Sequence, residues 1–328
     1  MKYNTTIFIP INGRLNYTIR VLEYLRLLNC KFNILIADGC KKKYFSQNFL
    51  SKNFPNLKID YQKFSYDKHF YNFVSKVKKS IELTTCKYIF ILPNDDFVNL
   101  KFLEDSENFL SKNKSYSCVG GEVKSFSVKN YFFYEDNSAG TLKIHGSYYK
   151  DKNKSIENKD LYGRMHSYSN LIPWELLHKK KILLEAFSIA KKIKTKNFHE
   201  LAWILNTLPL FYGKKKKFSQ SNLYRQLNTT NSAGRDMTYS DVDYAKIKKY
   251  LAKKVRKFSN QKNENKKIIT FFNKELNKQK KRFTQIEKKN LLNKTYKFIK
   301  LFLIFRPKIK QKLYDILKTA NSAKLLLR

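Results

Sequence analysis

Short apolar runs alternate with helical patterns from Thr6 to Asn113, and this alternation constrains the fold more than any other feature. Four runs rich in Ile and Phe have the composition of β-strands: "TIFI" (6–9), "FNILIAD" (32–38), "LKIDY" (57–61) and "YIFIL" (88–92). Apolar residues recur at helical spacing between them, for example Val21, Leu22, Leu25 and Leu28. Strands that alternate with helices predict an α/β fold, in which helices flank a mainly parallel sheet that binds ligands at the carboxyl ends of its strands.

Three of the predicted strands are followed or closed by residues that would meet at one edge. Pro10 follows the first strand, Asp38 closes the second, and Asp95 and Asp96 follow the fourth. Because the carboxyl ends of parallel strands lie at the same edge of a sheet, we expect a mouth lined with carboxylates there.

The stretch "YIFILPNDDF" places Asp95 beside Asp96 with no basic residue among its ten positions. Two like charges about 4 Å apart repel by about 1 kcal/mol in water and by about 4 kcal/mol at an effective dielectric constant near 20, so we expect a cation to bind them. No lysine or arginine within this stretch can serve as that cation. The alternative is that the aspartates cap a helix beginning in "FVNLKFL".

The order of these pieces resembles the first half of a GT-A-fold glycosyltransferase of the family-2 type. "TIFIPINGR", "FNILIADGC" and "YIFILPNDDF" match its pattern of a strand ending in Pro-x-x-x-Arg, a second ending in Asp, and a later strand ending in an acidic triplet. The match covers Thr6 to Phe97, and Phe198 to Gln226 more loosely. Pro93 and Asn94 stand where acids are common, and the triplet is nearest to a variant group that reads "DDDF".

The resemblance implies a Rossmann-type, GT-A-like catalytic domain and a nucleotide-sugar-dependent enzyme, a hexosyl- or related transferase of the inverting kind. The sugar would pass from a nucleotide-sugar donor to a glycan or lipid-linked acceptor in cell-surface polysaccharide synthesis. The resemblance also implies that Mn²⁺ or Mg²⁺, held by Asp95 and Asp96, bridges the donor's diphosphate. The residues matched to nucleotide-sugar contacts are Pro10, Arg14, Asp38, Lys76, Asp95 and Arg225.

Structural alternatives exist for several of these matched residues. Asp38 is also an ordinary residue of an Asp-Gly turn, Arg14 an exposed residue at a helix start, and Lys76 a residue of a solvated helix face. Arg225 has the guanidinium fork that suits a diphosphate.

An inverting transfer needs a base that removes the proton of the acceptor hydroxyl. The resemblance implies an "ED"-like pair near the start of a helix, and "NFHELAWIL" offers His199 and Glu200 there. Glu200 is the predicted base, with His199 as its assistant. Glu175 and Asp160 are alternative bases, and an ordinary first-turn glutamate is the structural alternative for Glu200.

The chain carries 67 Lys and Arg against 26 Asp and Glu, a formal charge of +41. "YGKKKKFS" predicts a basic turn and "NLYRQLNTTNSAGRD" a loop, and after Asp241 lysine-rich helical stripes dominate. We therefore predict a GT-A-like catalytic domain at 1–234 and a basic α-helical appendage at 235–328. The appendage, with the segment "KFIKLFLIFRPKIK", is expected to dock on an anionic membrane. The alternative is a helical bundle packed on the catalytic domain.

Several other classes of protein lack support in the sequence. There is no GxGxxG, GxxxxGK[ST] or HExxH motif, and no apolar stretch approaches the roughly 20 residues that span a bilayer. Without a signal-peptide pattern and with four single cysteines, the expected location is the cytoplasm, on the inner face of the membrane. The rival function is a non-enzymatic, basic nucleic-acid-binding protein on an α/β scaffold. Few of the late basic residues are Arg, so no nucleic-acid partner is expected.

Overall fold

The structure is a computed structural model that describes residues 3–130, 138–148, 154–167, 173–227, 229, 243–259, 261–278 and 280–281. The chain forms two compact units, Met1–Asn273 and Lys274–Arg328. The described residues of the second unit, 274–278 and 280–281, are helical. The predicted domain boundary between residues 234 and 235 falls outside the described residues and stays a prediction.

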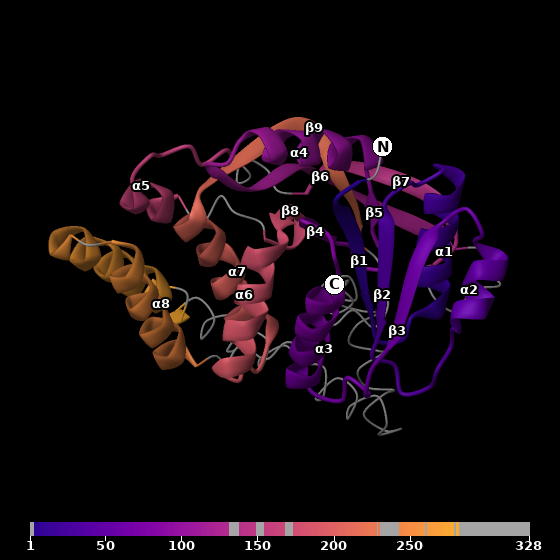
Figure 1. Cartoon of the computed structure of the whole chain (residues 1–328), viewed down its shortest axis with the longest axis horizontal. Helices are drawn as coiled ribbons and strands as arrows, with labels where there is room; N and C mark the ends of the chain where they lie inside the picture. Colours follow the sequence, from indigo (N-terminus) through magenta and orange to yellow (C-terminus); the bar gives the residue numbers. More distant parts are fainter. Residues whose placement is uncertain are drawn as a thin grey trace, which may run out of the picture. The chain divides into compact units, whose positions relative to one another are not determined.

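The first half of the sheet is parallel, and each predicted strand is present. Its strands are β1 (Thr5–Ile11), β2 (Asn33–Asp38), β3 (Lys58–Lys63) and β4 (Tyr88–Ile91), in the order β3-β2-β1-β4. The helices that connect them are α1 (Leu15–Leu27), α2 (Gln47–Asn53) and α3 (Phe70–Leu83) (Figure 1). Ile7 and Ile9 of β1 are fully buried and share a core with Val21 and Leu22 of α1. The predicted strand and helix periodicities therefore meet in one packed layer.

The second half of the sheet is mixed and continues from β4. Its strands are β5 (Phe97–Val98), β6 (Tyr116–Asn130), β7 (Gly140–Ser147), β8 (Leu176–Lys179) and β9 (Lys214–Gln226). β8 runs antiparallel to both β4 and β6, β9 runs parallel to β6, and β5 runs antiparallel to β9. The full order is β3-β2-β1-β4-β8-β6-β9-β5, with β7 paired to β6. This arrangement brings the end of β9 beside the residues that follow β4.

β9 corrects the predicted basic turn and the first part, 222–226, of the predicted loop. Of the rest of that loop, 228 and 230–236 lie outside the described residues. The residues of β9 pair with β6 from Tyr116↔Lys214 to Phe126↔Gln226, so the lysine run is a strand. Lys215 is fully buried, and burial lowers the pKa of its ammonium group to about 8. Pairing with a long neighbouring strand outweighs the low strand propensity of lysine, which local sequence alone reflects.

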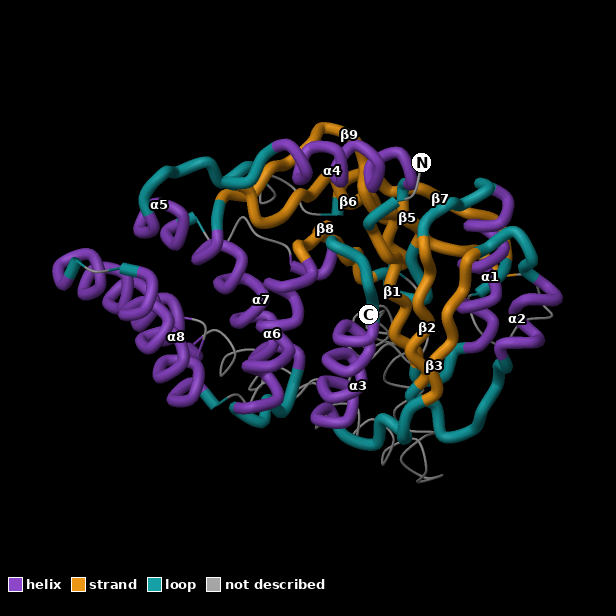
Figure 2. The backbone as a smooth tube through the Cα atoms, viewed as in Figure 1, coloured by secondary structure: helices purple, strands orange, loops and turns teal. Residues whose placement is uncertain are grey.

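Five more helices and a 3₁₀ turn, η2 (Pro173–Glu175), complete the described elements. The helices are α4 (Leu100–Lys112), α5 (Leu161–His166), α6 (Lys180–Lys192), α7 (Phe198–Tyr212) and α8 (Tyr244–Phe258). Helix α6 packs against both α3 and α7, and α7 packs against α8. Figure 2 shows these four helices side by side. Further helical residues follow α8 at 262–273.

α8 packs its apolar face inside the first unit. Ile247, Leu251 and Val255 are buried, and the Phe258 ring lies 5.3 Å from the ring of Phe211 on α7. Lys254 forms an ion pair with Glu185 of α6. For α8, the packed-bundle alternative therefore describes its apolar face.

We expect Leu251→Ala to lower the free energy of unfolding by about 2–5 kcal/mol, because it leaves a cavity between α8 and its neighbours. The matched control is Lys249→Ala, an exposed position of the same helix. Chemical denaturation of the full chain measures both. Equal free energies of unfolding for the two variants would show that α8 contributes no packing.

Candidate functional site

Asp38 ends β2 in a buried position surrounded by hydrogen-bond donors. Its carboxylate accepts hydrogen bonds from Tyr61 Oη at 2.6 Å and from the backbone N–H of Cys40 at 2.7 Å, and Lys63 Nζ lies 3.5 Å away. Burial raises the pKa of Asp38, but these hydrogen bonds and the Lys63 charge outweigh burial and place the pKa below its usual value. The Asp38 carboxylate is therefore a stable buried acceptor at the sheet edge.

The loops that follow β1 and β2 are joined to each other. The backbone N–H of Gly39 donates to the carbonyl of Ile11 at 2.9 Å, and the N–H of Gly13 donates to Cys40 Sγ at 2.8 Å. Pro10, half-buried in β1, is in register with Ala37 of β2. Pro10, Asp38 and the start of α1 are thus brought together, as strand-end geometry predicts.

Lys76 contradicts the alternative of a solvated helix face. It is 3% exposed, its Nζ donates to the Ile11 carbonyl at 2.8 Å, and it forms an ion pair with Asp67, which is also buried. A Cβ on Gly39 would lie 2.3 Å from the Asp67 carboxyl, so the glycine permits this contact. Sequence analysis did not identify Asp67 as a site residue, because the stretch "SYDKHF" around it matches no motif and does not follow a predicted strand end.

The residues after β4 meet arginines from distant segments. Arg14 Nη2 lies 2.9 Å from Asp95 Oδ2, and Arg20 Nη2 donates to the backbone carbonyl of Asp95 at 2.8 Å. Asn94 Nδ2 donates to the backbone carbonyl of Arg14 at 3.2 Å and to Thr18 Oγ1 at 3.1 Å. The cation expected beside Asp95 is thus supplied, in this structure, by the side chain of Arg14.

Asp96 points into the sheet instead. It is 2% exposed, its Oδ1 accepts from the backbone N–H of Gln226 at 3.0 Å, and its Oδ2 lies 3.6 Å from Arg225 Nε. Arg225 also forms an ion pair with Glu175 of η2 and lies over the Tyr148 ring at 5.0 Å. Burial, and then the charge of Asp95, raise the pKa of Asp96 to about 7.

The helix-cap alternative for the two aspartates is wrong. The N-cap of α4 is Asn99, whose side chain accepts from the backbone N–H groups of Lys101 and Phe102. The aspartates therefore belong to the strand-end cluster of Arg14, Asp95, Asp96, Glu175 and Arg225, which we call the arginine–carboxylate cluster.

The donor set at this cluster does not fit the predicted metal site. Mg²⁺ bound with a nucleotide takes one or two carboxylates at about 2.0–2.1 Å. Asp95 is engaged by Arg14, Asp96 by a backbone N–H beside Arg225, and Asn94 presents its amide nitrogen to two oxygens. The predicted Mn²⁺ or Mg²⁺ stays an untested expectation.

The residues considered as bases lie in different surroundings. Glu200, 1% exposed at the start of α7, accepts from the backbone N–H of Lys196 and of Asp243, both at 2.8 Å. Burial lowers the pKa of its half-buried neighbour His199. Asp160 caps α5 by accepting from the N–H of Gly163 at 2.6 Å. Among Glu200, Asp160 and Glu175, only Glu175 belongs to the arginine–carboxylate cluster, through its ion pair with Arg225.

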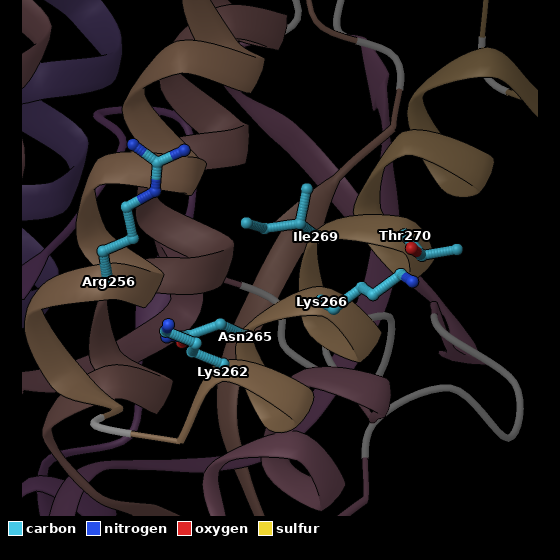
Figure 3. A pocket seen from close by; sticks show the side chains of 6 residues that line it. All are labelled: Arg256, Lys262, Asn265, Lys266, Ile269 and Thr270. Atoms are coloured by element: carbon cyan, nitrogen blue, oxygen red, sulfur yellow. The ribbon is translucent and has the colours of Figure 1, made fainter.

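A hollow of about 450 Å³ lies elsewhere, between α8 and residues 262–270 (Figure 3). Three of its six lining residues are basic, namely Arg256, Lys262 and Lys266. The residues that line the hollow include no carboxylate, and they belong to the basic helices, not to the sheet edge.

Across the residues that the structure describes, no helix has the length and apolar character needed to cross a membrane.

Comparison with known proteins supports the fold. No family model and no curated protein matches the sequence. S. aureus TarS 1–349 in complex with UDP-GlcNAc matches with a TM-score of 0.54 at 11% identity, covering 83% of this chain and 72% of that chain. TarS 1–349 without this ligand matches with a TM-score of 0.52 at 12% identity, covering 83% and 70%. The predicted GT-A-like α/β class is confirmed.

The raised pKa of Asp96 predicts how stability depends on pH. The unfolded carboxyl releases its proton near its ordinary pKa of 3.8, whereas the folded one does so near 7. The folded chain therefore binds more protons between these values, and this carboxyl lowers the free energy of unfolding as the pH rises through the window.

Asp96→Asn removes that titration. Relative to the parent chain, the variant should gain free energy of unfolding as the pH rises from about 4 to about 7. Urea denaturation across this range measures the effect, with exposed Asp60→Asn as the control. A difference between variant and parent that stays constant with pH would contradict the assigned protonation.

Proposed function

We propose that this chain is a glycosyltransferase that moves a sugar from a nucleotide-sugar donor to a glycan or lipid-linked acceptor in cell-surface polysaccharide synthesis, with inversion at the anomeric carbon. The observation that carries the proposal is the linked edge of the GT-A-like sheet. Asp38 contacts Cys40, Cys40 contacts Gly13, and the adjacent Arg14 contacts Asp95. The edge thus offers a buried acceptor at one end and cations at the other.

These two ends suit the two parts of a nucleotide sugar. The Asp38 carboxylate, held by Tyr61 and Cys40, can accept hydrogen bonds from a base or ribose. The guanidinium groups of Arg14 and Arg225 can face the diphosphate, because a guanidinium fork matches phosphate oxygens. S. aureus TarS binds UDP-GlcNAc in a structure of the same fold, so UDP-sugars are the first donors to test.

The base that receives the acceptor's proton is assigned here to Glu175, with Glu200 as the competing assignment. Glu175 belongs to the cluster, where its carboxylate forms an ion pair with Arg225. Glu200 instead holds the backbone before α7 and at the start of α8. His199, beside Glu200, would assist only under the competing assignment.

Replacing Glu175 with Gln should lower the transfer rate by about 10²–10⁴, the usual contribution of a positioned base. Glu200→Gln should instead lower the melting temperature and leave the rate per folded molecule within about twofold. Release of nucleoside diphosphate from UDP-sugars, with a mixed glycan acceptor pool, measures the rates. A loss of rate in Glu200→Gln alone, without a loss of stability, would transfer the role of base to Glu200.

We infer further that the basic helical face docks the enzyme on the anionic, cytoplasmic side of a membrane, where a lipid-linked acceptor would be reached. This face consists of the exposed residues Lys249, Lys253, Arg256, Lys257, Lys262, Lys266 and Lys267. Because the apolar side of α8 is packed inward, contact through this face would be electrostatic. Each lysine or arginine near an anionic surface contributes about 1 kcal/mol to the free energy of membrane binding. The segment "KFIKLFLIFRPKIK" lies outside the described residues.

Flotation with vesicles that contain anionic lipid tests this docking. The parent chain should bind at low salt and be released at high salt, because screening shortens the reach of surface charges. The double variant Lys249→Glu with Lys253→Glu should bind less than the control Lys52→Glu with Lys58→Glu, which changes the net charge equally on α2 and β3. Equal binding by both double variants would contradict docking through α8.

A further inference from the structure

We propose that Arg14 and Arg225, rather than a divalent metal, supply the positive charge that faces the donor's diphosphate, and that Asn94, Asp95 and Asp96 position these two arginines. The inference rests on the proposed function, because it concerns how the same site holds a nucleotide sugar. It starts from the contacts of the arginine–carboxylate cluster, in which both aspartates already have cationic neighbours.

Arg14 is held at both its backbone and its side chain. It is the N-cap of α1 and lies in the left-handed region (φ 63°, ψ 49°), directly after Gly13, whose φ is +85°. A residue other than glycine is uncommon in this conformation, so the surrounding contacts must favour it. Asn94 provides one of them by donating to the Arg14 carbonyl, and Asp95 provides another by pairing with the guanidinium. The residues after β4 thus aim the Arg14 side chain.

This role explains why the triplet begins with Asn94 and not with an acid. The side chain of Asn94 faces two oxygens, the backbone carbonyl of Arg14 and the hydroxyl of Thr18. An amide can donate to both, whereas an ionised carboxylate has no hydrogen to donate. Asparagine at this position therefore suits a residue that fixes a neighbouring backbone, and a third carboxylate would disrupt that contact.

The second arginine is fixed from three directions. Glu175, 1% exposed, forms an ion pair with Arg225, Asp96 lies 3.6 Å from its Nε, and the Tyr148 ring lies 5.0 Å from its guanidinium carbon. Asp96 is directed to the backbone of β9 by the N–H of Gln226. A metal that left this buried hydrogen bond intact would have to bind Asp96 through Oδ2, the oxygen that lies 3.6 Å from Arg225 Nε.

The Arg14 side chain has donor capacity beyond its bond to Asp95. Its side chain is 18% exposed, and its Nε is a buried atom that has no hydrogen-bond partner among the described residues. A guanidinium carries five N–H donors in a planar fork, and such forks bind phosphate oxygens in pairs. Cations fixed in place before the reaction also stabilise charge that develops on a leaving diphosphate.

Calorimetry of UDP, GDP, CDP and TDP binding to the full chain, once in Mn²⁺ and once in EDTA, tests the inference. At least one nucleotide should bind in EDTA within about threefold of its affinity in Mn²⁺. Arg14→Gln should weaken binding about tenfold in both buffers, whereas Arg26→Gln, an exposed arginine of α1 paired only locally with Glu23, should leave it unchanged. Asp95→Asn should leave binding in EDTA within about threefold, because the amide oxygen still accepts a hydrogen bond from the Arg14 guanidinium and keeps it in position.

A metal site predicts different results for the same variants. It predicts binding in Mn²⁺ alone and its loss in Asp95→Asn, and this pair of results would overturn the inference while leaving the proposed function intact. Asn94→Asp separates the two cases again: arginine positioning predicts weaker binding in EDTA, and a metal site predicts tighter binding in Mn²⁺. Failure of every nucleotide to bind in either buffer would overturn both the inference and the proposed function. Thermal unfolding of each variant confirms that it is folded.

Discussion

Two adjacent aspartates at the end of a buried strand need positively charged partners, and the rest of the site depends on how the fold supplies these partners. All four residues of β4 are buried, so Asp95 and Asp96 emerge where unpaired charge is costly. The neutralising arginines come from α1, 81 residues before Asp95, and from the end of β9, beside the Gln226 amide 130 residues after Asp96. The cluster can form only when the parallel half of the sheet and the β6–β9 half have joined. Fold and site are therefore coupled through these ion pairs.

Within the first unit, charge is arranged differently at the sheet edge and on the exposed helical surface. At the sheet edge, carboxylates and arginines alternate and nearly cancel, whereas the exposed faces of α8 and of residues 262–267 carry lysines with few acids among them. A broadly positive field raises the rate at which anionic ligands and surfaces approach, but it does not select among them. Selection falls to the few fixed groups of the edge. A formal charge of +41 thus says more about encounter than about chemistry.

Sequence analysis correctly predicted elements that depend on neighbouring residues. It was wrong or silent where contacts between distant segments determine the structure. Ile and Phe runs located β1 to β4, and strand-end geometry correctly placed Pro10, Asp38 and Asp95 at the same edge of the parallel strands β2, β1 and β4. The lysine run at 214–217 suggested a turn because its strand partner, β6, lies about a hundred residues earlier. In the same way, "YIFILPNDDF" contains no cation, although the fold supplies two. Asp67 gave no signal because no motif marks it, although its partner Lys76 is only nine residues later. The contact of Glu175 with Arg225 gave none because the two residues lie 50 positions apart.

The protonation states along the edge indicate how a bound nucleotide would be oriented. Hydrogen bonds and Lys63 hold the pKa of Asp38 below its usual value, so this end presents a full negative charge that accepts N–H and O–H donors. Burial and Asp95 raise the pKa of Asp96 to about 7, so near neutral pH the other end shares a proton and opposes an anion less than two full charges would. The arginines then dominate the potential on that side. Under the proposed function, a ligand with donors at one end and phosphates at the other would gain from one orientation and lose from its reverse, so the edge would distinguish the two ends of a nucleotide before any sugar is recognised.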